Sequence, residues 1–501
     1  MNPTVTAMTG GHVLVAGAGV AGRGAARLLA HLGARVTVAD DDADRSARLA
    51  AECGGRRLGV TDACDLLATG HPPAGDDPLP AVDLVVMSPG WRPGSPLPRA
   101  AAEAGVPVVG DLDVARSADA AGLVGPSRTW IVLTGTNGKT TTTAMTAAIL
   151  RADGRSAAAV GNIGASPAEQ LLADERTGVR TDVLVVEASS FQLHWSRDLH
   201  PDVGCVLNLA EDHLDWHGDM TAYAADKATC LTGAVAVLAA DDPAVLVAAE
   251  PVVTGRRRAF TVGDPQAAAR ALGTTGPVVG VRDGRLVETD GPDRGETVDL
   301  APADGISPPG PAGVADAAAA ASLARAVGVT PGAVARALGS FTVAPHRGQV
   351  VHREPGPDGV GEIRWIDNSK ATNPHAAYAA LAGLDGTVWV AGGQLKGADV
   401  DDLVRDVAPR LRGAVLLGAD RAVIARALAR HAPSVPVTVV DGTDPATVMG
   451  HAVRAARTLA RPGDTVVLAP AAASLDMFDG MSHRGDLFAR YACSTREERD
   501  Q

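Results

Sequence analysis

A glycine-rich segment, GTNGKTT at residues 135–141, has the residue types of a phosphate-binding loop. It follows the apolar run at residues 130–133 and precedes a helical pattern, so backbone N–H groups and a helix N-terminus would point at one spot. Lys139 would contact the terminal phosphates of a nucleoside triphosphate, and Thr140 would contact Mg²⁺. Leu133 replaces the usual first glycine, which shortens the loop and keeps its anion-binding geometry. The alternative is a glycine-rich turn with a solvated lysine.

Acidic and imidazole side chains follow two further apolar runs. Glu187 closes the run VLVVE and is placed to serve a metal ion, the alternatives being a helix N-cap or an ion pair. The segment EDHLDWH, residues 211–217, follows the next run, and its His213 could position metal or substrate. Each of its charges taken alone fits a solvated loop equally well. Lys227 is by default a surface lysine.

A second glycine-rich turn lies near the N-terminus. Gly17, Gly19 and Gly22 separate a strand pattern from a helix pattern, and the next strand ends at Asp40. This is the βαβ pattern typical of dinucleotide sites, which offers helix N-terminal amides to a diphosphate. Asp40 would suit a ribose hydroxyl. The alternatives are a structural tight turn and a solvated acidic run that continues through Asp44.

Valine-rich runs alternate with Ala/Leu/Arg helix patterns along the chain, which predicts an α/β fold with parallel sheets covered by helices. The length of 501 residues implies several domains. We expect a first linker at residues 118–127, a hairpin turning at Asp283–Gly284, a proline-rich surface loop at residues 299–313 and an alanine-rich helix from about residue 314. A third block starts near residue 345, with strands at RWID, TVWVAGG, AVLLGAD and DTVVLAP.

Composition narrows the functional class. The formal net charge of −13 disfavours nucleic acid and anionic membranes as partners. Five cysteines without a C-x-x-C pair predict neither a zinc site nor disulfides, and fit a reducing compartment. The N-terminus does not have the pattern of a signal peptide, and no apolar stretch approaches the ~18 residues of a membrane span. We therefore expect a cytoplasmic protein.

Six segments occur in an order that resembles the Mur ligases: GTNGKTTT, VEASSFQL, NLAEDHLD, PHR, DNSKATNP and APAAASLDMF. Within that superfamily, SKATN and ASLD are similar to the branch that adds D-glutamate to UDP-N-acetylmuramoyl-L-alanine. The resemblance implies three domains: a Rossmann-like domain at residues 1–122 for the UDP substrate, a central P-loop ATPase domain at 123–341, and a Rossmann-like domain at 342–501 for D-glutamate. It also implies a monomer.

The resemblance implies an ATP-dependent amide ligase of peptidoglycan precursor synthesis, which phosphorylates a carboxylate to an acyl phosphate that an amine then attacks. Lys139, Glu187, His213 and Lys227 would be catalytic, and Lys227 matches a lysine that family members carry as a carbamate. Metal-binding residues would be Thr140, Glu187, His213 and Lys227, with Mg²⁺ as the ion. ATP would be bound by Gly135, Thr136, Asn137, Gly138, Lys139, Thr140, Thr141, Arg347 and Asp367.

Two further sets of residues follow from the resemblance. The UDP substrate would be bound by Gly19, Val20, Ala21, Asp40, Ser88, Gly90, Asn162 and His213. D-Glutamate would be bound by Lys370, Thr372, Lys396 and Ser474, whose cations and hydroxyls suit two carboxylates. The alternative for the two lysines is surface charge. The chain departs from the family pattern at Ala21, Asp41, Asp42, Ala312, Gly313, Asp316, Asn368 and Met481.

Three other functions remain open at this point. A folate polyglutamate ligase shares the ATPase core but does not explain the N-terminal glycine turn. An NAD-dependent oxidoreductase rests on that turn alone and leaves Lys139, Glu187 and His213 without a role. A non-catalytic nucleotide-binding regulator would not need the full set of reactive residues.

Overall fold

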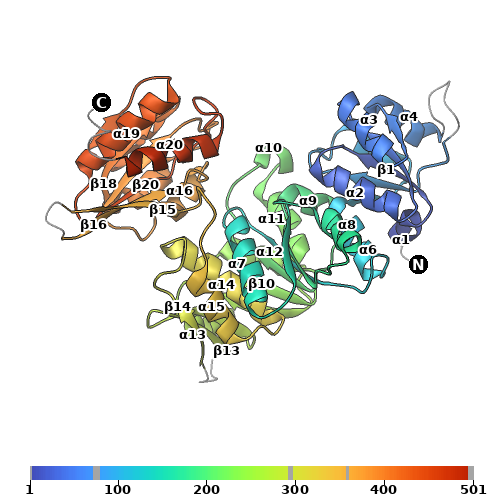
Figure 1. Ribbon diagram of the computed structural model, residues 1–501, viewed down its shortest axis with the longest axis horizontal. Helices are drawn as coiled ribbons and strands as arrows, with labels where there is room; N and C mark the ends of the chain where they lie inside the picture. Colours follow the sequence, from blue (N-terminus) through green and yellow to red (C-terminus); the bar gives the residue numbers. More distant parts are fainter. Residues whose placement is uncertain (1–2, 71–78, 292–296, 357–359, 495–501) are drawn as a thin grey trace. The chain divides into compact units, whose positions relative to one another are not determined.

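A computed structural model describes residues 3–70, 79–291, 297–356 and 360–494 (Figure 1). They form two compact units: Met1–Ala301 with Ala318–Ala337, and Pro302–Ala317 with Leu338–Gln501. The first unit holds two sheets and the second holds one. In the part of the chain that the structure describes, no helix has the length and apolar character of a membrane span. All five cysteines are free.

The N-terminal sheet is parallel, with the strand order β3-β2-β1-β4-β5. Its central strands are continuous apolar runs buried along their length, which is typical of a parallel sheet covered on both faces. The elements are β1 His12–Ala16, β2 Arg35–Ala39, β3 Arg56–Leu58, β4 Leu84–Met87, β5 Val108–Gly110, α1 Pro3–Met8, α2 Val20–His31, α3 Ala43–Glu52, α4 Val60–Thr69, α5 Pro96–Glu103 and α6 Asp111–Ala120.

The central sheet has the order β14-β13-β12-β11-β10-β9-β6-β8-β7, and its strands from β7 to β12 are parallel. The predicted hairpin is confirmed: β12 and β13 are antiparallel around Asp283 and Gly284, both with positive φ. The strands are β6 Thr129–Thr134, β7 Ala157–Gly161, β8 Val183–Glu187, β9 Val203–Val206, β10 Val235–Ala239, β11 Arg256–Phe260, β12 Pro277–Arg282, β13 Arg285–Asp290 and β14 Thr297–Pro302.

Helices cover this sheet, and the alanine-rich helix begins at Pro311, a residue suited to the first helical turn. The predicted surface loop at 299–313 is wrong at both ends, because β14 occupies its start and this helix its end. The helices are α7 Lys139–Ala152, α8 Pro167–Thr177, α9 Ser190–Trp195, α10 Leu214–His217, α11 Met220–Ala228, α12 Pro243–Ala249, α13 Pro265–Leu272, α14 Pro311–Ala326 and α15 Pro331–Ser340.

The C-terminal sheet has the order β15-β16-β20-β17-β18-β19. The four predicted strands are confirmed as β16, β17, β18 and β20, which pair in parallel; β15, antiparallel to β16, was not predicted. The elements are β15 Gln349–Pro355, β16 Glu362–Asp367, β17 Thr387–Gly392, β18 Leu411–Leu417, β19 Val437–Val439, β20 Thr465–Leu468, α16 Pro374–Leu381, α17 Asp401–Val407, α18 Arg421–His431, α19 Pro445–Leu459 and α20 Met481–Cys493. Three sheets in this arrangement confirm the predicted α/β class.

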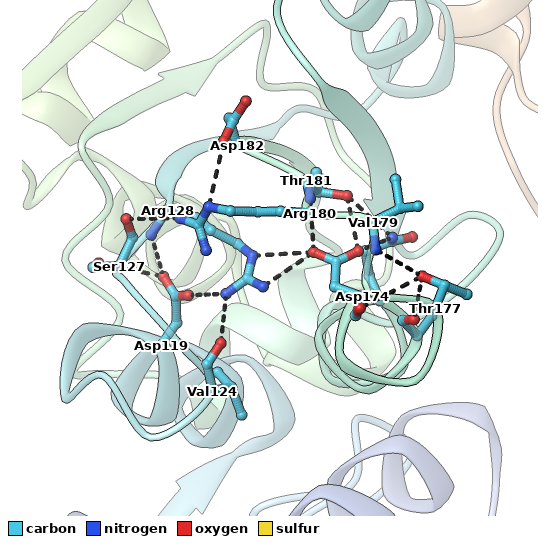
Figure 2. A network of polar contacts seen from close by, with 12 residues as sticks. Asp119, Val124, Ser127, Arg128, Asp174, Thr177, Val179, Arg180, Thr181 and Asp182 are labelled. Carbon is cyan, nitrogen blue, oxygen red and sulfur yellow. Dashed lines mark hydrogen bonds and ion pairs between the residues drawn. The ribbon is translucent and has the colours of Figure 1, made fainter.

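The segment expected to be a linker, residues 118–127, contributes Asp119 to a fully buried ion pair with Arg128 (Figure 2). Asp119, in the last turn of α6, accepts from Arg128 Nη1 at 2.6 Å and from Trp130 Nε1 at 2.9 Å. The same guanidinium donates to Asp174 of α8 at 3.0 Å, and Asp174 also accepts from the Thr181 N–H at 2.9 Å. The linker interpretation is therefore wrong for Asp119, whose carboxylate joins α6 to the central sheet.

Replacement of Arg128 by leucine should strongly destabilise the first unit. The variant leaves Asp119 as a buried carboxylate without its cation, and breaking such a pair costs roughly 3–5 kcal/mol. The matched control is Arg180→Leu, because Arg180 pairs with Asp182 at the surface, where an ion pair contributes about 0–1 kcal/mol. Urea unfolding followed by fluorescence measures both; equal midpoints for the two variants would contradict the prediction.

Asp111, at the start of α6, is a buried acid whose charge opposes folding. Its Oδ2 accepts from Gln192 Nε2 at 3.0 Å, and its Oδ1 has no partner among the described residues. Burial raises the pKa of Asp111 to about 6. The folded state therefore holds this proton more tightly than the unfolded chain, and stability falls as pH rises from about 4 to about 6.

Asp111→Asn should therefore stabilise the protein at neutral pH by about 1–3 kcal/mol and have little effect near pH 4. Asp44→Asn, at the exposed first turn of α3, serves as the control. Urea midpoints at the two pH values provide the measurement. A gain for Asp111→Asn that is the same at both values would show that its charge is not the cause.

Candidate active site

The predicted phosphate loop connects the C-terminal end of β6 to the first residue of α7 (Figure 1). Gly138 has φ +80°, a left-handed conformation that glycine adopts without strain. A Cβ on Gly135 would lie 2.9 Å from the Leu207 side chain. Lys139 Nζ donates to the carbonyls of Gly135 at 2.8 Å and Thr136 at 2.9 Å, so the loop curls around the ammonium group.

Two residues that the sequence analysis did not identify hold this loop in shape. Asn208 accepts from the Asn137 N–H at 2.9 Å and donates to the Asn137 carbonyl at 3.2 Å. Tyr223 of α11 places its hydroxyl 3.0 Å from Thr136 Oγ1. Asn208 is among the first polar residues after the buried strand β9, a position that faces the ligand crevice of a parallel sheet. That position was the signal available for Asn208.

Glu187 lies at the C-terminal end of β8, next to β6, and is 2% exposed. Its Oε1 accepts from Asn162 Nδ2 at 3.0 Å, whereas its Oε2 is buried and has no hydrogen-bond partner among the described residues. A buried carboxylate oxygen without a donor is costly, and a cation would offset that cost. Glu187 therefore fits a metal ion. The predicted substrate residue Asn162 contacts this carboxylate.

No group of three or more His, Cys, Asp or Glu side chains is arranged to hold a metal in the part of the chain that the structure describes. Mg²⁺ does not require such a group, since it is commonly bound by one or two carboxylates together with water and substrate phosphates. The donor set predicted here, a threonine hydroxyl with Glu187, is of that kind.

Lys227 is buried against the phosphate loop, so its interpretation as a surface lysine is wrong. Its Nζ donates to the Gly135 carbonyl at 2.9 Å and to Thr134 Oγ1 at 3.2 Å, and lies 4.8 Å from the centre of the Tyr223 ring. Burial, and then the charge of Lys139, lower the pKa of Lys227 well below its usual value. Two lysines thus share one loop carbonyl.

The residue before Lys227 anchors helix α11. Asp226 is buried and accepts hydrogen bonds from His217 Nδ1 at 2.8 Å, His194 Nδ1 at 2.9 Å and Arg197 Nη2 at 2.6 Å. Burial would raise the pKa of Asp226, but these partners lower it. Asp226 was not identified from the sequence. Its contacts join α11 to α9, the helix that follows Glu187.

His213 occupies the turn before α10 with φ +54°. Its half-exposed ring lies 4.8 Å from the Phe191 ring, and its only ion pair among the described residues is with Asp212 at 3.6 Å. The structure therefore brings Lys139 and Lys227 together at Gly135, but it shows no direct contact between His213 and either Glu187 or Thr140.

The N-terminal glycine turn borders a cavity of about 510 Å³. A Cβ on Gly22 would lie 1.8 Å from the Gly17 carbonyl oxygen, so this turn requires glycine. Asp40 Oδ2 accepts from the Ala18 N–H at 2.6 Å, and although burial would raise the pKa of Asp40, its backbone hydrogen bonds lower it. Six of the eight predicted UDP-binding residues line the cavity, whereas Asn162 and His213 do not. The lining residues are Gly17, Gly19, Val20, Ala21, Asp40, Asp41, Ser88, Pro89, Gly90 and Trp91.

In the second unit, Asp367 closes β16 and is fully buried. Its Oδ2 lies 2.6 Å from His346 Nδ1, and its Oδ1 accepts from the Ser369 N–H at 2.9 Å. Burial raises the pKa of Asp367 above its usual value. The Lys370 N–H donates to the His346 carbonyl at 3.1 Å, so the segment containing Arg347 packs against the loop that carries Lys370 and Thr372.

A buried arginine that the sequence analysis missed connects the three loops that carry the predicted D-glutamate residues. Arg484 of α20 is 0% exposed. It donates to Ser369 Oγ at 3.0 Å and to the carbonyls of Ser369 at 2.9 Å, Ala472 at 3.1 Å and Gly392 at 3.3 Å. Burial lowers the pKa of Arg484 to about 10. The predicted D-glutamate residues follow on the same loops: Lys370 and Thr372 after Ser369, Ser474 after Ala472, and Lys396 after Gly392.

Backbone strain is concentrated in the same loops. Non-glycine residues with positive φ are uncommon and tend to occur at functional sites. Six non-glycine residues of the described chain have positive φ, and four of them lie in segments that carry proposed site residues: His213, His346, Lys396 and Ala471.

Three family models match parts of the chain. Residues 133–273 match the Mur ligase middle domain, and residues 346–472 match the Mur ligase glutamate ligase domain. Residues 1–98 match the C-terminal domain of the alanine dehydrogenase/PNT family. The middle-domain match contains the phosphate loop, Glu187 and Lys227, and the glutamate-ligase match contains Asp367, Lys370 and Lys396.

Curated relatives are similar along almost the whole chain. UDP-N-acetylmuramoylalanine–D-glutamate ligase of Corynebacterium jeikeium is 56% identical over 96% of this chain and 93% of its own length. The protein of the same name from Mycolicibacterium smegmatis is 47% identical over 96% of both chains. The solved structure of the MurC ligase of Thermotoga maritima shares the fold, with a TM-score of 0.52 at 16% identity over 98% of this chain and 99% of its own. On this evidence the chain belongs to the Mur ligase family.

Proposed function

We propose that the chain is an ATP-dependent ligase that joins D-glutamate to UDP-N-acetylmuramoyl-L-alanine in peptidoglycan precursor synthesis. The observation that carries this proposal is the pairing of a phosphate loop around Lys139 with the unpartnered carboxylate oxygen of Glu187 on the neighbouring strand. The names and the high identity of the relatives support the choice of substrates. No specific observation favours a folate ligase. The match of residues 1–98 to the alanine dehydrogenase/PNT domain is confined to the N-terminal part of the chain, and an oxidoreductase would leave Lys139 and Glu187 without a role.

The reaction requires two anions, the triphosphate of ATP and the carboxylate of the substrate, to approach each other. A carboxylate becomes an electrophile when ATP phosphorylates it, which forms a C–O–P bond and releases ADP; the amine nitrogen then bonds to that carbon and phosphate leaves. Cations must offset the repulsion between triphosphate and carboxylate. We assign this role to Lys139, to the amides of residues 135–141 and, on the second unit, to Arg347.

Thr140 and Glu187 would hold one Mg²⁺ and His213 a second, and the ions would supply charge neutralisation at the phosphates. Within this chain, Asn162 orients the Glu187 carboxylate by donating to its Oε1, and Tyr223 and Asn208 hold the loop.

The remaining assignments follow the same logic. The cavity at the N-terminal glycine turn is proposed to bind the UDP group, with Ser88 and Gly90 on its rim and backbone amides for the diphosphate. Lys370, Thr372, Lys396 and Ser474 are proposed to bind the two carboxylates of D-glutamate. We further propose a monomeric, cytoplasmic enzyme with domain boundaries near residues 122 and 341.

The experiment that tests the function is phosphate release by the purified chain with ATP, Mg²⁺ and UDP-N-acetylmuramoyl-L-alanine. D-Glutamate, L-glutamate and meso-diaminopimelate are added in turn. We expect release only with D-glutamate. Release that depends on another amino acid, or on a folate in place of the UDP substrate, would refute the assignment.

Lys227 is proposed to carry a carbamate, and activity should therefore depend on dissolved CO₂. Only a neutral amine attacks CO₂, forming an N–C bond and releasing one proton, and the lowered pKa of this buried lysine supplies the neutral form. We expect activity to fall in CO₂-free buffer and to return with bicarbonate. Because acid protonates the amine, the loss should be faster at lower pH.

Carbon-13 NMR after addition of labelled bicarbonate measures the modification directly. Lys227→Arg keeps a cation but cannot form the carbamate, and it should lose activity by about 100-fold or more without recovery in bicarbonate. The absence of a carbamate signal from the active wild-type enzyme would refute this role.

A further inference from the structure

The central sheet has a second hollow, at the edge opposite the phosphate loop. A cavity of about 500 Å³ is bordered by the N-terminal ends of β10, β11 and β12, at Val235, Arg256 and Pro277. These strands are parallel to β6, whose C-terminal end carries the phosphate loop. A strand of five residues spans roughly 16 Å, so the body of the sheet separates the two sites.

Three consecutive arginines, Arg256, Arg257 and Arg258, line this cavity. The exposed side chain of Arg256 makes no hydrogen bond or ion pair with any residue that the structure describes. Arg257 has only a distant partner, Glu250 at 3.7 Å, in a solvent-exposed pair that contributes little. The cavity is therefore locally basic in a chain whose formal net charge is −13.

Arg258 is the least exposed of the three, with 11% of its side chain exposed. Its Nη2 donates to Glu288 at 2.9 Å, but the same carboxylate also accepts from Arg325 at 3.0 Å, so one negative charge is shared between two guanidinium groups. The Nε of Arg258 is buried and has no acceptor among the described residues. A buried donor without an acceptor is uncommon in folded proteins.

The other wall of the cavity is polar and tightly turned. It is formed by Leu272, the last residue of α13, and by the turn at residues 273–276, where Gly273 has φ +60° and the Thr274 hydroxyl accepts from the Gly276 N–H at 3.1 Å. Arginine side chains opposite hydroxyl groups and turn amides are the groups that bind phosphate oxygens, because a guanidinium donates two parallel hydrogen bonds to them.

We propose that this cavity binds a small phosphorylated anion and is separate from the ATP site. Arg256 and Arg257 supply the outer charges, Arg258 the buried donor, and residues 274–276 the opposite wall. A ligand held at this edge cannot reach the phosphate loop, so it is an effector and not a substrate. The inference is independent of the identity of the amino acid that the enzyme adds.

Binding of inorganic pyrophosphate to the full chain tests the proposal by calorimetry, with ADP and Mg²⁺ saturating the phosphate loop. The test variant is Arg256→Gln with Arg257→Gln, which removes two exposed charges and leaves Arg258 in place. Arg285→Gln is the matched control, since Arg285 is an exposed arginine of β13 that pairs with Asp299 outside the cavity. Ligase activity without pyrophosphate should be unchanged in both variants.

We expect wild type and control to bind pyrophosphate at one additional site, and the double variant to bind it at least ~10-fold more weakly. The affinity should also fall with added salt. Equal affinity in the double variant, or no additional site in wild type, would overturn the proposal. Binding of citrate in place of pyrophosphate would overturn the assignment to phosphorylated ligands.

Discussion

Lys139→Ala will form ADP at least about 1,000-fold more slowly than the wild type, the largest effect that we expect from a single substitution. The ammonium of Lys139 lies inside the curled loop, 2.8 Å from the Gly135 carbonyl. Alanine would remove this ammonium from the loop and leave the proposed charge neutralisation to the backbone amides, the metal ion and Arg347. The measurement is ADP formation in a coupled assay at saturating ATP, Mg²⁺ and both other substrates.

Two variants control this prediction. Lys139→Arg should also be nearly inactive, because a planar guanidinium is larger than the ammonium that the loop encloses. Lys370→Ala should bind ADP normally and mainly impair the use of D-glutamate, since Lys370 lies in the second unit, in the loop between β16 and α16. Comparable ATP turnover in Lys139→Ala and wild type would exclude the proposed role of the loop.

The phosphate loop and the main strands could be predicted because each produces a recognisable pattern within a short stretch of sequence. A buried parallel strand is a continuous apolar run, and the turn after it must contain glycine where φ is positive, as at Gly138. The same holds for Glu187, an acid at the end of the apolar run VLVVE. These residues are recognisable because strand, turn and helix occur consecutively.

Lys227 could not be recognised by such a pattern, because its burial depends on a loop more than 90 residues earlier in the chain. Composition held a signal that the sequence analysis did not use. Of the 45 lysines and arginines, only four are lysines: Lys139, Lys227, Lys370 and Lys396. Each lies in one of the proposed site segments. Where only a surface cation is needed this chain uses arginine, so its lysines indicate positions that need a compact or titratable amine.

The contacts that hold the site together were the part that the sequence could not reveal. Asp119 lies in a segment with the composition of a linker, yet its carboxylate is bonded to Arg128 and Trp130. Arg484 lies in the polar sequence MSHRGD, which predicts an exposed helix start. Both side chains are buried because distant segments surround them, and no periodic pattern in the neighbouring residues indicates this burial.

Arg484→Met should raise the KM for D-glutamate by roughly 100-fold while changing the affinity for ADP little. The guanidinium holds the Ser369, Ala472 and Gly392 carbonyls from one point, so its loss frees three loops at once. A 100-fold loss of affinity corresponds to about 2.8 kcal/mol, which is within the range expected when hydrogen bonds from a charged donor to the binding loops are lost. Arg484 itself touches no proposed substrate group, which makes it a positioning residue.

The split between KM and kcat distinguishes this role from a loss of folding. Arg490→Met, an exposed arginine on the same helix, is the matched control and should behave as wild type. Ser369→Ala removes the hydroxyl that accepts from Arg484 Nε and donates to the Met481 carbonyl, so it should raise the same KM by a few-fold in a fully folded protein. Arg484→Lys should restore part of the affinity, because an ammonium can still donate to two of the carbonyls. If kcat falls in these variants while the KM for D-glutamate stays at the wild-type value, then Arg484 does not position the D-glutamate loops.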